Sequence, residues 1–455
     1  MSVADEPLAG SAPPAGTTSR PAITSPLLSM WALFLGVLAM MMGNGLQGTV
    51  MGIRSAEEAF DVFVIGLIQA AYYIGFLAGS RFTIRALSKV GHVRVFAALA
   101  STASTAFVLP AIFVSPVPYM AMRLVIGFCM AGLYVVTESW LNDQATPETR
   151  GRTLSLYMVV SLGGVTLGQL LLNVAEPTGF ELFVIASVLV SISLVPMALS
   201  ESSAPQLPAF ERLAFRTLFS IVPTGVVTMF FSGAAAGAVF AFAPVYATQI
   251  GMTTSQISLF IAAALVGSLV FQIPIGNLSD KLPRRGIIAG SAAAATAASV
   301  LGTMTTTGTP ALVVMFVLGA TSFPLYSLAI AYTNDWISNE QRVGAAGLLV
   351  MVNGIGAISG PLVASLLMSA FGASAYFWSL AGPHAMVLLY VLFRIAARDA
   401  VPVEEQSEYR PYTARSSPLA ATIGRRRRPK APRSRRRRSP SEREHGVPPA
   451  SDNTP

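Results

Sequence analysis

Two charged residues lie inside one long apolar stretch of this sequence, residues 117–141, where a charge is costly. They are Arg123 and Glu138, fifteen positions apart and too distant along a helix to pair directly. An arginine in such a stretch either faces a polar cavity, where it can grip an anionic or carbonyl-bearing ligand, or extends to the membrane surface. Glu138 either carries a proton or forms an ion pair, for which the candidate partners are Arg81, Arg85 and Arg152.

Uncharged polar and aromatic residues occur in the other apolar stretches. Asn44 and Gln47 are three residues apart, which puts both on one face of a helix. Hydrogen bonds between helices, or an aromatic belt at the membrane surface, are the alternative role for every residue of this kind. The remaining candidates for binding a solute or for coupling are Gln69, Tyr73, Tyr157, Gln169, Gln272, Tyr326 and Asn353.

Several kinds of chemistry are excluded by the composition. Cys129 is the single cysteine, and the three histidines are far apart, so we expect no disulfide within the chain and no metal site. The sequence contains no phosphate-binding GxxxxGK[ST] motif, which argues against ATP-driven transport. We therefore expect no cofactor and no enzymatic activity.

The elements that must position these residues are membrane-spanning helices. The mean hydropathy is +0.61, and only 29 of the 52 charged residues fall within residues 30–398. A bilayer core about 30 Å thick needs about 20 apolar residues per helix. This length predicts an all-α polytopic membrane protein with about twelve spans, at residues 30–52, 63–82, 95–114, 117–141, 153–174, 180–199, 218–248, 255–275, 286–306, 311–332, 344–371 and 376–395.

Lysine and arginine are concentrated in alternate loops, and this asymmetry predicts the orientation in the membrane. The opposite loops offer only Arg54, beside Glu57, Glu58 and Asp61. We expect a multi-pass protein of the cell membrane, with both termini on the cytoplasmic side and the first span retained. The basic residues of the cytoplasmic loops are Arg81, Arg85, Lys89, Arg94, Arg150, Arg152, Arg212, Arg216, Lys281, Arg284, Arg285 and Arg342.

The second half of the chain repeats the first at an offset of 192 residues. Five residues of the first half are identical to the residues 192 positions later: Gly127 and Gly319, Tyr134 and Tyr326, Asp143 and Asp335, Gly164 and Gly356, and Gly168 and Gly360. Parallel six-span repeats are the plan of one large class of transporters. The predicted boundaries are an N-terminal segment 1–29, a first half 30–199, a cytoplasmic connector 200–217, a second half 218–398 and a tail 399–455.

The tail is rich in arginine, proline and serine and poor in aliphatic residues. It includes two runs of four arginines, at positions 425–428 and 435–438. Such a segment cannot bury enough apolar surface to order itself, so we expect disorder and contact with anionic lipid headgroups. Binding of nucleic acid is not expected, because no aromatic residues are interleaved with the arginines. We expect the protein to be a monomer in the bilayer.

The turn after the eighth predicted span resembles a signature of the major facilitator superfamily. It reads Gly276-Asn-Leu-Ser-Asp280-Lys-Leu-Pro-Arg284-Arg285-Gly286. Gly276 would admit a neighbouring helix, and Asp280 would meet both the N-terminus of an adjacent span and a nearby arginine. The cluster is therefore interpreted as a latch of a cytoplasmic gate.

The matching turn of the first half keeps the glycines and the basic residues but not the acid. Gly79, Arg85, Gly91 and Arg94 are the gate candidates there, and Thr83 stands where the aspartate is expected. This difference predicts two unequal latches. A further resemblance to the superfamily is the arginine of the fourth span, followed by Gly127 four residues later.

The resemblance implies transport of a small solute by alternating access, coupled to an ion gradient. Proton coupling is the expected form. Gln169 stands where the fifth-span signature of drug/proton antiporters ends in proline, and this difference favours uptake of a polar metabolite. The abundance of Phe and Met favours efflux of amphipathic drugs instead. Both directions stay open. The segment Glu138-Ser-Trp-Leu-Asn is similar to a bacterial branch with unassigned substrate. The alternative function is a membrane sensor or scaffold that keeps the transporter fold.

Overall fold

The described part of the chain is built almost entirely from helices long enough to cross a membrane. The computed structural model describes residues 30–146, 149–198, 213–305, 307–338, 340–397 and 401–412. Within them, twelve helical segments have the length and apolar composition of membrane spans, which confirms the predicted all-α class. The N-terminal segment, most of the connector and the tail from residue 413 lie outside the described residues, so those predicted boundaries stay predictions.

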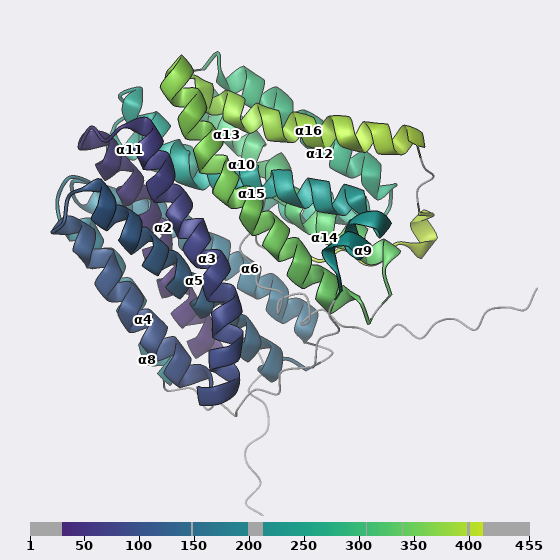
Figure 1. Cartoon of the computed structure of the whole chain (residues 1–455), viewed down its shortest axis with the longest axis horizontal. Helices are drawn as coiled ribbons and strands as arrows, with labels where there is room; N and C mark the ends of the chain where they lie inside the picture. Colours follow the sequence, from purple (N-terminus) through teal and green to yellow (C-terminus); the bar gives the residue numbers. More distant parts are fainter. Residues whose placement is uncertain are drawn as a thin grey trace, which may run out of the picture. The chain divides into compact units, whose positions relative to one another are not determined.

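The first six spans and the last six form two successive sets (Figure 1). The short helix α9 (Phe215–Ile221) precedes the second set, and a single turn, η3 (Val403–Glu405), follows it. The first set is α2 (Trp31–Glu57), α3 (Val62–Val90), α4 (His92–Val108) with η1 (Leu109–Ala111), α5 (Pro116–Gln144), α6 (Arg150–Leu170) with η2 (Leu171–Val174), and α7 (Glu181–Ile192) with α8 (Leu194–Ala198). The second set is α10 (Pro223–Gln249), α11 (Thr254–Ser279), α12 (Arg284–Gly302), α13 (Thr309–Ser322) with α14 (Pro324–Trp336), α15 (Arg342–Phe371) and α16 (Ala375–Ala397).

Short polar signals set where individual helices begin and break. Asp61 precedes α3 and its carboxylate accepts the N–H groups of Phe63 and Val64, at 2.9 and 3.3 Å. Thr253 and Gln256 form a reciprocal capping box at the start of α11. The tenth span, expected as one helix, is divided at Pro324 into α13 and α14, because proline has no N–H to continue the helical ladder.

Glycine contacts show that the two sets are repeats of one packing plan. Gly127 of α5 lies against the carbonyl of Tyr72 in α3, and Gly319 of α13 lies against the carbonyl of Ala264 in α11. Gly127 and Gly319 are 192 residues apart, and so are the residues that they face, Tyr72 and Ala264. This is the offset found in the sequence. A Cβ at either glycine would overlap the facing backbone, so the close approach of each helix pair requires glycine. The same offset relates Gly45–Val165 to Gly237–Ala357, Gly75–Leu124 to Gly267–Phe316, and Gly168–Met42 to Gly360–Ala234.

The two halves touch firmly at one end of the bundle. We call the end with the turns at residues 88–94 and 280–285 the basic end, and the other the opposite end. At the opposite end, Ser258 of α11 donates to the carbonyl of Gln169 in α6 at 2.7 Å, and Ser255 donates to Asn173 at 2.7 Å. The pairs α2–α10, α3–α15 and α6–α11 join the halves. These contacts close the opposite end.

Candidate functional site

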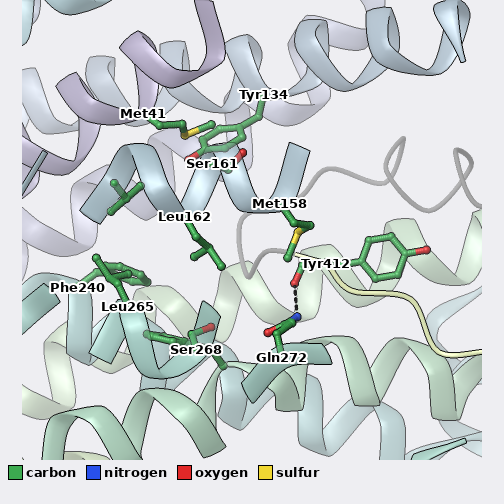
Figure 2. A pocket seen from close by; sticks show the side chains of 12 residues that line it. Met41, Tyr134, Met158, Ser161, Leu162, Phe240, Leu265, Ser268, Gln272 and Tyr412 are labelled. Atoms are coloured by element: carbon green, nitrogen blue, oxygen red, sulfur yellow. Dashed lines mark hydrogen bonds between the residues drawn. The ribbon is translucent and has the colours of Figure 1, made fainter. Parts of the chain in front are cut away.

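A cavity lies between the two halves, with walls from both. Its lining is mainly apolar. The first half contributes residues of α2, α5 and α6, which are Met41, Tyr134, Met158, Ser161, Leu162 and Val165 (Figure 2). The second half contributes residues of α10, α11 and the α13–α14 junction, which are Phe240, Leu265, Ser268, Gln272 and Phe323. A mainly apolar lining with a few polar side chains suits a small solute with an apolar body and a few hydrogen-bonding groups.

The twelfth residue of the lining belongs to the tail. Tyr412 is 5% exposed, and its carbonyl oxygen accepts a hydrogen bond from Nε2 of Gln272 at 3.2 Å. Figure 2 shows this bond, with the phenol ring of Tyr412 directed away from the cavity. Gln272, a residue predicted from the sequence, therefore does line the cavity, but in this structure its amide is engaged by the chain's own backbone.

Glu138 and Tyr157 form a buried pair beside this cavity. Both side chains are fully buried, and the Tyr157 hydroxyl donates to Oε1 of Glu138 at 3.1 Å. Each is one turn from a lining residue, since Tyr134 lies on α5 and Ser161 on α6. Arg81, Arg85 and Arg152, the predicted ion-pair partners, have exposed side chains, and Arg81 contacts the sulfur of Met351.

Arg123 is the centre of a different polar cluster, inside the first half. Its Nη1 donates to Oε1 of Gln47 at 3.1 Å, its Nη2 donates to Oε1 of Gln69, and its guanidinium lies 4.7 Å from the centre of the Tyr72 ring. Tyr72 in turn donates to Asn44 at 3.4 Å. The side chain is 4% exposed, so the extension to the membrane surface that the sequence left open is not seen. Arg123 is also not among the residues that line the described cavity.

The other predicted polar residues join helices to one another. Gln169 accepts a hydrogen bond from Thr49 at 2.7 Å and donates to the carbonyl of Gly45 at 3.1 Å, which ties α6 to α2. Asn353 donates to the carbonyl of Met229 at 3.1 Å, which ties α15 to α10. Tyr73 and Tyr326 are buried, and Tyr73 packs edge-on against Tyr72. None of these four lines the described cavity.

The basic end of the second half contains a dense charged network. Arg284, 2% exposed, donates from Nη1 to both carboxylate oxygens of Asp335 at 2.7 Å and from Nη2 to Asp280 at 2.8 Å. This agrees with the predicted pairing of Asp280 with an arginine. Arg285 points elsewhere: its Nε donates to the Tyr332 hydroxyl at 2.9 Å, and its Nη1 to the Arg394 carbonyl at 3.2 Å.

Two expected contacts of this turn are replaced by contacts with the tail. Gly276 faces the ring of Tyr409 rather than a neighbouring helix. Asp280 accepts the backbone N–H of Tyr409, at 2.9 and 3.1 Å, where the sequence predicted the N-terminus of a span. The reason is that residues 401–412 return to the bundle, although their composition predicts disorder. Burial raises the pKa of the Tyr409 and Tyr412 phenols, so both rings are neutral at ordinary pH.

The corresponding polar cluster of the first half contains a histidine. His92 is buried, lies 3.0 Å from the Ser139 hydroxyl and 3.6 Å from Asp143, and its ring lies against Trp140. His92 and Asp143 precede Arg284 and Asp335 by 192 residues each. The clusters of the two halves, each predicted as a latch, therefore lie at equivalent places and consist of different residue types. Gly79 lies against the Phe128 carbonyl, Gly91 has a φ of 83° at the turn, and Arg85 and Arg94 are exposed.

Several residues of this site were not identified from the sequence. Asp335 was found as the counterpart of Asp143 in the repeat but was not assigned to the gate. His92 could have been assigned, because the same 192-residue offset pairs it with Arg284. Ser327, Ser407, Tyr409 and Tyr412 carried no such signal, since nothing in composition or spacing brings residues 401–412 to α11 and α14.

Known proteins share both the sequence pattern and the fold. Two stretches of the chain, residues 33–253 and 225–441, match the family described as Major Facilitator Superfamily. The chain belongs to this superfamily. The uncharacterized MFS-type transporter YcaD of Escherichia fergusonii is 26% identical over 374 residues, covering 82% of this chain and 97% of that protein. The protein of the same name from Salmonella typhimurium is 26% identical over 383 residues, with the same coverage.

Solved structures of other transporters have the same fold at low identity. The nucleoside transporter NupG has a TM-score of 0.64 at 14% identity, covering 81% of this chain and 98% of that one. A bacterial homolog of the human lysosomal transporter Spinster, in an inward-facing and unoccupied conformation, has a TM-score of 0.62 at 14% identity, covering 88% and 97%. A variant of the Escherichia coli fucose:proton symporter FucP has a TM-score of 0.53 at 15% identity, covering 82% and 99%.

Proposed function

We propose that this chain is a proton-coupled secondary transporter of a small solute, working by alternating access. Membership of the superfamily supports a membrane transporter rather than an enzyme. The observation that supports the finer proposal is the cavity between two repeated halves that are joined at the opposite end. Rocking of such halves about a central site would expose it to each side in turn.

The basic end is the cytoplasmic end in this proposal. The proposal rests on the excess of lysine and arginine in the loops there. Because the halves are held together at the opposite end, we propose that this conformation is inward-facing. The apolar walls favour a solute with an apolar body, and Ser161, Ser268 and Gln272 offer hydrogen bonds for its polar groups. Uptake and efflux both remain compatible with this lining.

Glu138 is the proposed site of proton coupling. It is a buried carboxyl one turn from the cavity wall, and Tyr157 donates a hydrogen bond to it. A carboxyl in such a place exchanges its proton when solvent reaches it in one conformation and is shielded in the other. The fucose:proton symporter FucP supports this only by analogy of fold.

A two-step experiment tests the proposal. A thermal-shift screen of the purified full chain against metabolites and drugs first finds a ligand, because binding to the folded state raises apparent stability. Flux of that ligand is then measured in proteoliposomes with and without an imposed pH gradient. Glu138→Gln keeps an oxygen for the Tyr157 hydroxyl, so binding should remain while gradient-driven flux is lost. Flux that ignores the gradient in the unmodified protein contradicts proton coupling.

The second candidate function is a membrane sensor or scaffold. The sequence feature that favours it is the arginine-rich tail. The same proteoliposomes discriminate the two functions. Absence of flux for every ligand found in the screen, together with a specific partner of the tail, would favour the sensor.

A further inference from the structure

The mouth of the cavity at the basic end contains a groove that receives an extended peptide. We propose that this groove, formed by α11, α12 and α14, is a peptide-binding site, and that residues 401–412 of the same chain are its occupant and act as a plug. The functional consequence, inhibition of transport until the plug leaves, rests on the proposed function. The existence of the site does not.

The inner end of the groove recognises one peptide unit. The backbone N–H of Tyr412 donates to the Ser327 hydroxyl at 2.8 Å, and that hydroxyl donates to the Tyr412 carbonyl at 3.0 Å. Gln272 donates to the same carbonyl at 3.2 Å and to the Ser327 hydroxyl at 3.0 Å. Ser327 and Gln272 are 0% and 4% exposed. Two buried polar side chains thus satisfy both backbone groups of a single residue.

The outer part of the groove recognises the backbone of two alternate residues. The N–H and the hydroxyl of Ser407 both donate to Asp335 at 2.7 Å, and its carbonyl accepts from Arg284 at 2.7 Å. Two residues further on, the N–H of Tyr409 donates to Asp280. Main-chain contacts at every second residue are typical of an extended peptide held in a groove.

Side-chain contacts add a specific anchor. The ring of Tyr409 occupies the space that the missing side chain of Gly276 leaves on α11, and Tyr409 is 8% exposed. Glu404, Glu405 and Glu408, by contrast, are exposed. The segment is therefore bound through its backbone and its tyrosines, and its acidic side chains face away from the groove.

The position of residues 401–412 explains how they would inhibit transport. Tyr412 is part of the cavity lining, together with Tyr134 and Met158 of the first half. Asp280, Arg284 and Asp335, the latch residues of the basic end, are engaged by the segment at the same time. The halves cannot close over the mouth while the segment lies between them, and a solute cannot pass it. Release of residues 401–412 is then a required step of the transport cycle.

The test measures how freely a reagent reaches the cavity. In the full chain with Cys129→Ser, a single cysteine is placed in the lining by Met158→Cys, and its labelling by a water-soluble maleimide is followed in detergent. Gly276→Ala puts a methyl group where the Tyr409 ring lies, so the ring must leave. Gly286→Ala is the matched control, because a Cβ there meets no atom within 4 Å. We expect labelling to become about tenfold faster with Gly276→Ala, equivalent to about 1.4 kcal/mol of lost binding, and to be unchanged with Gly286→Ala.

A second pair of variants leaves the bundle untouched. Tyr409→Ala combined with Tyr412→Pro removes the ring and the N–H that Ser327 accepts. Labelling should accelerate as with Gly276→Ala, and the control Glu404→Ala with Glu405→Ala should not change it. A synthetic peptide of the sequence of residues 401–412, added to the first of these variants, should slow labelling again, and the same peptide with Tyr412→Pro should not.

The outcomes are distinct. Unchanged labelling in the tail variant, at an unchanged melting temperature, overturns the plug even if Gly276→Ala accelerates labelling, because the effect of the glycine would then come from helix packing. Failure of the peptide to slow labelling overturns the binding site. Faster labelling without any solute flux leaves the plug standing and contradicts the proposed transport function instead.

Discussion

At the scale of single residues, Arg123 is hydrogen-bonded within the first half and does not line the described cavity. Its guanidinium satisfies the side-chain oxygens of Gln47 and Gln69 inside the first half. The amide nitrogens of Asn44, Gln47 and Gln69 are buried and have no hydrogen-bond acceptor among the described residues. A buried amide oxygen without a hydrogen-bond donor lowers the stability of the fold, so this cluster depends on the guanidinium of Arg123.

Arg123→Met should accordingly destabilise the protein. Loss of the guanidinium leaves two buried oxygens without their donor, and we expect a cost of about 2–3 kcal/mol. The melting temperature and the membrane yield should fall together. Arg216→Met, at an exposed position of α9, is the control and should change neither. Equal melting temperatures for the two variants would falsify the packing role.

For a substitution of Glu138 we expect the opposite result, an unchanged melting temperature. Glu138→Gln keeps the hydrogen bond from Tyr157, so the melting temperature should stay close to that of the unmodified protein. Only a function that requires titration of the carboxyl should be lost. If the melting temperature falls as far as with Arg123→Met, Glu138 serves the fold rather than coupling.

At the scale of elements, helix pairs within each half are fixed by glycines that face a carbonyl. Gly127→Ala on α5 would place a methyl group against the backbone of Tyr72 on α3, where no side chain can move aside. We expect destabilisation of about 1–3 kcal/mol from this overpacking, measured as a lower melting temperature. Gly163→Ala on α6 has open space around its Cβ and should be neutral or slightly stabilising. A melting temperature that does not distinguish them would show that α3 and α5 can separate freely.

At the scale of the whole molecule, the predicted orientation in the membrane rests on the distribution of lysine and arginine among the loops. A tag at Gly372, in the turn between α15 and α16, should be reached only from outside the cell, whereas tags at Ser203 and after Ser417 should be reached from the cytoplasm. Protection of these tags in intact cells and in inverted vesicles measures this. Labelling of Ser203 from outside would reverse the assignment of the basic end and, with it, the inward-facing interpretation.

Much of the candidate site followed from patterns that are local or periodic. Arg284 and Asp280 lie four residues apart around one turn, so their pairing depends only on the beginning of α12. Tyr157 and Glu138 were both singled out as polar residues in apolar helices, but their contact depends on how α5 and α6 cross. Gln169 and Asn353 looked the same as Gln272 in sequence. Only the facing helix decides whether such an amide meets a carbonyl or a cavity.

The sequence by itself determined the twelve spans, the two-fold repeat and the excess of positive charge at one end. Hydropathy is summed over some twenty neighbouring residues, and the repeat is a comparison of the chain with itself, so neither requires a fold. The tertiary structure alone decided that residues 401–412 lie in the mouth of the cavity. Ser407 and Asp335 are 72 positions apart, and Tyr412 and Gln272 are 140 apart. These contacts are possible because the spans bring α11 and α14 together and end α16 beside them, and composition carries no information about that arrangement.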